Sequence, residues 1–196
     1  MAKIPLYFRD DEFFNDFGTT CYINYEKMVD NFPLYRHNFI EISLILEGSG
    51  IEIINGKKYP IHAGCISVTM PWHFHTILTS YNAPIKRFIC EFSLEDYLNY
   101  AEIWPRSKEA IFDKSYNSVM ELNESELNRC KSIFNNMYEC FTSDYVDKQS
   151  ALYIKLIEFM MLFRQMQENK KPLDSKKPQQ EEGTVNNALR YIHQYY

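Results

Sequence analysis

The sequence lacks the features that mark secreted, membrane-spanning and metal-clustered proteins. Its five cysteines are odd in number, and none is spaced as the CxxC pair of a zinc or redox site. No apolar run approaches the length that a membrane span requires, and the first five residues do not read as a signal peptide. We therefore expect reduced thiols, no membrane partner and a cytoplasmic location.

The net charge and the absence of catalytic motifs argue against two further classes, nucleic-acid-binding proteins and enzymes. The chain carries 21 Lys and Arg against 26 Asp and Glu, a net charge of −5, and has no dense basic run. Phosphate contacts need clustered Lys and Arg, so we do not expect this chain alone to bind nucleic acid. GxSxG, HExxH and phosphate-binding glycine loops are also missing, and we predict a protein that is not an enzyme and needs no cofactor.

Glycine is scarce and unevenly distributed, which separates two architectures. Four of the six glycines fall between Gly48 and Gly64, and the next one is Gly183. Tight turns therefore crowd the first half, where Asn55-Gly56 between two apolar runs predicts a type I′ hairpin. This half predicts short strands typical of a barrel or sandwich, at residues 21–25, 39–46, 50–54, 57–61, 65–70, 74–79 and 86–92.

The second half has helical spacing instead. Asn123 and Glu126 form the pattern of a capping box, and apolar residues follow at helical intervals. A second helix is predicted from about residue 147 to 167. Its apolar stripe is too broad for one neighbouring helix, so either a second copy of the chain or the barrel must cover the rest. The stripe comprises Leu152, Tyr153, Leu156, Ile157, Phe159, Met160, Met161 and Phe163.

The segment from Tyr35 to Gly48 carries the strongest functional signal. Side chains alternate along an extended strand, so Tyr35, His37 and Glu41 are predicted to share one face. Ile40, Ile42, Leu44 and Leu46 occupy the other face. Polar groups on one face of such a strand are expected to line a ligand pocket at the mouth of a small barrel.

Several motifs occur in a meaningful order. Tyr35-x-His37-x3-Glu41-x6-Gly48 matches HxHxxxE followed by glycine, with Tyr35 in place of the first histidine. A second motif begins at Gly64 and ends at His75. Residues 47–50, 59–64 and 185–196 complete the pattern. Together they resemble the sensor half of an AraC-type transcription regulator, whose effector domain has the cupin fold.

The resemblance implies a mainly β chain with helices: a cupin-like β-barrel (a double-stranded β-helix) followed by a two-helix antiparallel hairpin. The implied parts are an N-terminal arm at 1–18, the barrel at 19–122, a helical dimerisation hairpin at 123–168, a linker at 169–183 and the start of an absent DNA-binding domain at 184–196. It also implies a small effector such as a sugar, a homodimer formed through 123–168, and contact with promoter DNA only through the absent domain. Residues 1–18 could instead be a permanent strand of the barrel.

The residues predicted to bind the effector are Tyr35, His37, Glu41, Trp72, His73 and His75. Trp72 could stack on a ring or simply plug the barrel end. Arg36 and Arg87 could clamp an anionic effector, although a lone arginine more often forms a surface ion pair. The alternative function is a metal-dependent cupin enzyme, an isomerase or dioxygenase, using His37, Glu41 and His75. We predict no metal, because Tyr35 replaces one ligand and a phenol holds its proton at neutral pH.

Overall fold

The computed structural model describes residues 6–79, 83–104, 106 and 117–170 of the chain. All but the first two residues of the predicted linker at 169–183, and the predicted start of a DNA-binding domain at 184–196, lie outside the described residues.

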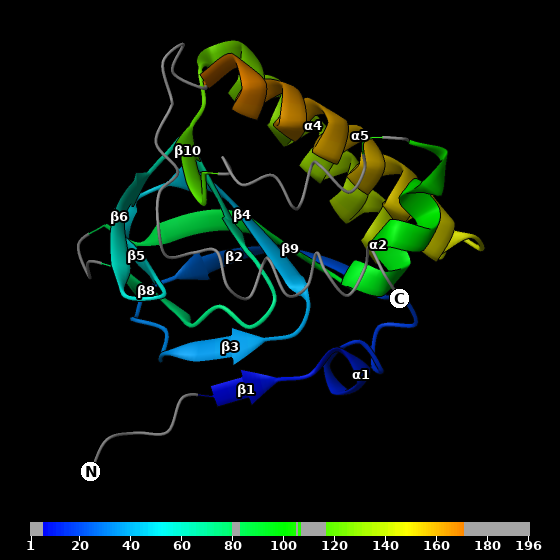
Figure 1. Cartoon of the computed structure of the whole chain (residues 1–196), viewed down its shortest axis with the longest axis horizontal. Helices are drawn as coiled ribbons and strands as arrows, with labels where there is room; N and C mark the ends of the chain where they lie inside the picture. The colour runs from blue at the N-terminus through cyan, green and yellow to red at the C-terminus, as the bar shows by residue number, and fades with distance from the viewer. Residues whose placement is uncertain (1–5, 80–82, 105, 107–116, 171–196) are drawn as a thin grey trace.

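Two five-stranded sheets lie face to face and form a barrel-like sandwich (Figure 1). In spatial order the first sheet contains β1 (Leu6–Phe8), β3 (Tyr35–His37), β8 (His75–Thr79), β5 (Ser49–Ile54) and β6 (Lys57–His62). In spatial order the second contains β10 (Val119–Glu121), β7 (Cys65–Thr69), β4 (Ile40–Glu47), β9 (Ile85–Phe92) and β2 (Cys21–Met28). The predicted mainly β fold with helices at the C-terminal end is confirmed.

The hairpin between β5 and β6 has the turn that its sequence requires. Asn55 and Gly56 have φ angles of 49° and 82°, the positive values of a type I′ turn. The Asn55 side chain also accepts a hydrogen bond from the backbone N–H of Phe74 at 3.0 Å, which ties the turn to the start of β8.

Strand β4 is buried on both faces, but in two different environments. Ile40, Ile42 and Leu44 belong to a large apolar core shared with the helices. Glu41 and Ser43 point between the two sheets, where polar groups gather. The prediction of one polar and one apolar face is therefore confirmed for this strand.

The long helices cover the outer face of the second sheet (Figure 1). After the short helices α1 (Asp10–Phe13) and α2 (Leu94–Tyr100), the long helices are α4 (Glu124–Thr142) and α5 (Lys148–Lys170). Asn123 and Glu126 form the predicted capping box, each side chain accepting a backbone N–H at 2.9 Å. A five-residue connection joins α4 to α5, which pack together through Phe134 and Phe159.

The broad apolar stripe of α5 is covered almost entirely from within the chain. Seven of its eight predicted members are buried in the core shared with α4 and the second sheet, and Met161 is 50% exposed. Ile154, outside the predicted stripe, is 66% exposed. The barrel and α4 therefore account for most of the stripe, and a second copy is not needed to cover it.

The segment from Tyr35 to Glu41 is not one extended strand, which corrects the sequence-based expectation. β3 and β4 belong to different sheets, and the chain turns between them at Asn38 and Phe39. The side chains still converge, because the turn brings the inward faces of both strands together. The short elements α1, α2 and β10 were not predicted, whereas β1 is an N-terminal strand on the barrel, one of the two alternatives for residues 1–18.

The described part of the N-terminal segment packs on the barrel. β1 adds to the edge of the first sheet, parallel to β3. Phe13 stacks on Phe39 with ring centroids 4.9 Å apart, and Phe14 meets the same ring edge-on at 5.4 Å. A regulatory role for residues 1–18 stays a prediction. None of the described helices is long and apolar enough to cross a membrane.

Candidate functional site

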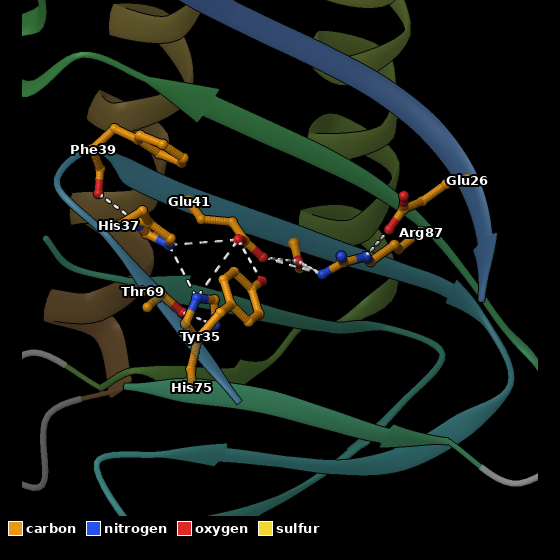
Figure 2. Close-up of polar contacts among 9 residues, drawn as sticks. Glu26, Tyr35, His37, Phe39, Glu41, Thr69, His75 and Arg87 are labelled. Carbon is orange, nitrogen blue, oxygen red and sulfur yellow. Dashed lines mark hydrogen bonds and ion pairs between the residues drawn. The ribbon is translucent and has the colours of Figure 1, made fainter. Parts of the chain in front are cut away.

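Three strands bring four of the predicted residues together between the sheets (Figure 2). Tyr35 and His37 come from β3, Glu41 from β4 and His75 from β8, and all four are buried. Backbone pairing sets this convergence, because Tyr35 lies opposite His75 in the first sheet. The tyrosine ring lies against His75 with centroids 3.9 Å apart.

The two imidazoles are joined directly. His37 Nε2 and His75 Nε2 lie 3.0 Å apart, and His37 Nδ1 lies 2.8 Å from the carbonyl oxygen of Phe39. A carbonyl only accepts, so His37 Nδ1 carries a proton and, in the neutral ring, His37 Nε2 is the acceptor. His75 Nε2 then donates to His37. The hydroxyl of Thr69 can complete the chain by donating to His75 Nδ1 at 3.4 Å.

Glu41 is the negative group at the centre of the site. Tyr35 donates its hydroxyl to Oε2 at 2.9 Å, and Arg87 Nη1 donates to Oε1 at 3.2 Å. Burial alone would raise the pKa of Glu41, but its interactions with His75, His37 and Arg87 outweigh that effect and lower it. Burial lowers the pKa of His75, and the charge of Glu41 opposes that shift.

Arg87 is buried, contrary to the surface ion pair considered for it. Its Nε donates to Glu26 at 2.6 Å and its Nη1 donates to Ser43 at 2.5 Å (Figure 2). Burial lowers the pKa of this guanidinium, but Glu41 and Glu26 outweigh that effect and raise it. Arg87 therefore donates its hydrogen bonds to Glu26, Glu41 and Ser43 of the protein and not to an anionic effector.

Trp72 lies outside this cluster. It is 38% exposed, has a φ of +70° and stacks on Tyr7 with centroids 5.5 Å apart. Arg36 lies over both of these rings. Trp72 therefore belongs to the outer surface beside β1, and its part in ligand binding stays a prediction.

His73 is buried, but it is not part of the converging group. Its Nδ1 has no hydrogen-bond partner. Burial, and then the nearby His37, lower the pKa of His73 to about 4. It is therefore a neutral ring at pH 7, and its part in ligand binding also stays a prediction.

Sequence reasoning missed most of the remaining polar interior. Glu52 of β5, Ser67 of β7 and Glu91 of β9 are buried. Burial, followed by the charge of Glu41, raises the pKa of Glu91 well above its ordinary value. The available signal was a polar residue at alternate positions of otherwise apolar strands, as in Ser67 and Thr69 of β7.

The donor atoms of three residues would fit a divalent metal ion. Among the residues that the structure describes, His37, Glu41 and His75 form the group whose ligand atoms all lie within 4.8 Å of one another. Glu41 Oε2 is 3.6 Å from His37 Nε2 and 3.8 Å from His75 Nε2. Two imidazoles and a carboxylate suit non-haem iron, and the Phe39 carbonyl holds His37 as a metal ligand is normally held. A metal bound there would act as a Lewis acid.

Comparison with known proteins gives a consistent picture. The sequence pattern of the AraC-like ligand binding domain matches residues 17–151. The HTH-type transcriptional activator RhaS of Yersinia pestis (strain Pestoides F) is 31% identical over 55 residues, 28% of this chain and 20% of that protein. The chain thus matches about a fifth of the length of RhaS.

A solved structure shares the fold over most of this chain. A variant of apo ToxT from Vibrio cholerae strain SCE256 matches 80% of this chain and 61% of its own, with a TM-score of 0.54 and 12% identity. A cupin protein from Bacteroides fragilis covers 38% of this chain and 64% of its own, with a TM-score of 0.33 and 25% identity. The fold comparison rests on the Vibrio cholerae structure.

Proposed function

The chain belongs to the family of AraC-like ligand binding domains, and from this we propose that it is the effector-sensing part of a transcription regulator. A small molecule binds in the polar interior between the two sheets and contacts His37, Glu41 and His75. Binding favours one arrangement of the domain over another. An attached DNA-binding module then changes its occupancy of promoter DNA, because a ligand shifts an equilibrium by its difference in affinity for the two states.

The observation that supports this proposal most strongly is the buried polar cluster itself. Two imidazoles, a phenol and an ionised carboxylate converge inside a domain whose other core is apolar. Burying such groups costs free energy that an apolar core would not incur, so their presence requires a functional reason. Imidazoles and a carboxylate offer both donors and acceptors to a small organic ligand.

We further propose that the protein works in the cytoplasm as a homodimer formed through α4 and α5. Ile154 and Met161, seven residues apart on α5, present exposed apolar side chains on one side of that helix. A symmetric contact between two copies would bury them. Sedimentation of the wild type and of Ile154→Glu tests this, and a wild type that stays monomeric at high concentration would remove dimerisation from the proposal.

The effector proposal is tested by thermal unfolding of the chain against a panel of sugars, amines, organic acids and aromatic metabolites. A ligand selective for the native state must raise the unfolding midpoint. His37→Ala and Glu41→Gln should lower the affinity for any compound that binds by tenfold or more. His62→Ala, which changes an exposed histidine, serves as the matched control and should leave the affinity unchanged. Equal affinity in wild type and His37→Ala would reject the proposed site.

A second candidate function is a metal-dependent cupin enzyme, and the convergence of three metal-ligand atoms favours it. Elemental analysis of purified protein separates the two candidates. Stoichiometric iron, manganese or zinc that is lost in His75→Gln would support the enzyme. Protein that refolds and binds an effector after treatment with a chelator would support the sensor.

A further inference from the structure

Glu52 is a buried carboxylate without a hydrogen-bond partner. It lies in β5, its side chain is fully buried, and neither Oε1 nor Oε2 has a hydrogen-bond partner in the structure. The side chain of Glu52 points into the barrel. Along β5 the adjacent Ile51 is exposed, whereas Ile54, two positions after Glu52, is buried. Buried polar atoms are almost always paired, so a carboxylate with two unpaired oxygens indicates a missing donor.

The position of Glu52 places it in the same interior as the cluster around Glu41. Ile54 lies opposite His75 in the pairing of β5 with β8, and Glu52 is the next inward position along β5. The Ser67 hydroxyl lies near enough to lower the pKa of Glu52 without meeting hydrogen-bond geometry, and the charges of Glu41 and Arg87 act on the same carboxyl group; all three residues come from the facing sheet. Glu52 therefore looks across the barrel toward the proposed effector site.

Carboxyl groups outnumber guanidinium and ammonium groups in this interior. Among the residues that the structure describes, the buried acidic side chains are Glu41, Glu52 and Glu91, and the buried basic side chain is Arg87, apart from the histidines. Arg87 already donates to Glu26, Glu41 and Ser43. No described buried cation is therefore left to neutralise Glu52.

We propose that the effector carries a protonated amine and that Glu52 is the group that binds it. This assignment rests on the proposed sensing function and names the ligand class for that site. An ammonium group supplies three donors and one positive charge, which match two unpaired oxygens in an acidic interior. The rest of the molecule lies toward His37, Glu41 and His75.

Anionic ligands and neutral polyols match this interior less well than an amine does. A carboxylate or phosphate ligand would meet Glu41 and Glu52 without a free cation to receive it. A neutral polyol could donate hydroxyl hydrogens to Glu52, but it carries no positive charge that would favour the ionised form of this carboxyl group. Burial raises the pKa of Glu52 to about 7, so an ammonium ligand can keep it ionised at neutral pH.

Matched pairs of compounds that differ by one ammonium group test the assignment. Thermal unfolding and calorimetric titration of the chain would compare glucosamine with glucose, ethanolamine with ethylene glycol, and putrescine with butane-1,4-diol, with glucuronate as an anion. The expected result is binding of at least one amine at least tenfold tighter than its hydroxyl partner. Glu52→Gln should lower that affinity by tenfold or more, while Glu102→Gln, at an exposed position, should not change it.

Each alternative result has a distinct meaning. Binding of a neutral sugar or an anion that depends on His37 but not on Glu52 would uphold the sensor and overturn the amine assignment. The absence of binding by every compound, including the wider metabolite panel, would count against both. An unfolding midpoint of ligand-free Glu52→Gln at or above that of the wild type would show that the variant is folded, so a loss of affinity could not be attributed to unfolding.

Discussion

The two faces of strand β4 open onto regions of opposite character. Outward, Ile40, Ile42 and Leu44 enter an apolar core formed with α2, α4 and α5. Inward, Glu41 and Ser43 enter a space lined by ionisable groups whose pKa values are shifted by burial and by one another. The same strand therefore contributes to a region that stabilises the fold and to a region that costs stability, for which we propose effector binding as the reason.

The helix-covered core should carry most of the stability. Phe159 is fully buried between α4, α5 and the second sheet, so Phe159→Ala should lower the free energy of unfolding by about 3–5 kcal/mol. Urea denaturation measures this loss. The remaining folded protein should bind effector normally, since the change lies outside the barrel. A loss below about 1 kcal/mol would mean that this core is not the stabilising region.

At one position of the polar interior, Glu52, a substitution should raise the free energy of unfolding instead of lowering it. The pKa of Glu52 is raised from 4.5 to about 7, so the folded state holds a proton that the unfolded state has released across this range. The free energy of unfolding of the ligand-free wild type should therefore fall by about 3 kcal/mol between pH 4.5 and 7.5 through this group. Glu52→Gln should remove that slope and be the more stable protein above pH 7.

Denaturation series of the two proteins across this pH range give the comparison, and Glu102→Gln provides the control. Parallel pH profiles for wild type and Glu52→Gln would contradict the unpaired state of the carboxylate.

A smaller effect should follow from loss of the hydrogen bond between Tyr35 and Glu41. Tyr35→Phe removes a donor to an ionised, buried carboxylate, and should cost about 2 kcal/mol of unfolding free energy. Chemical denaturation at pH 7 measures it. Tyr25→Phe, which changes an exposed tyrosine of β2, is a control for the removal of a tyrosine hydroxyl. An unchanged stability of Tyr35→Phe would indicate that Glu41 does not depend on this donor.

The smallest effect should come from the end of a helix, where the interaction is local and exposed. Asn123→Ala removes one half of the capping box of α4 and should cost about 1 kcal/mol. Thermal unfolding compared with Asn128→Ala, an exposed asparagine inside the same helix, separates the cap from the general effect of the substitution. A cost equal to that of the control would mean that the capping box contributes no measurable stability.

Features that depend on residues close together in the sequence were predicted, whereas features that depend on distant residues were not. The Asn55-Gly56 turn and the Asn123 capping box depend on residues within four positions, and both were predicted. β3 has three residues and pairs with β1 and β8, far away in the sequence, so no local pattern marks it. The burial of Arg87 depends on Glu26 and Glu41, which lie 61 and 46 positions away. The pattern of alternate residues placed His37 and Glu41 on one face although the chain turns between them.

The central claim is that the effector binds among the buried imidazoles, and the chain's five histidines make nuclear magnetic resonance a direct test. Imidazole ¹⁵N shifts would be recorded with and without a compound that raises the unfolding midpoint, with each ring assigned by His→Gln variants. The account predicts that the signals of His37 and His75 move while that of the exposed His62 does not. Binding that leaves both His37 and His75 unchanged would contradict it.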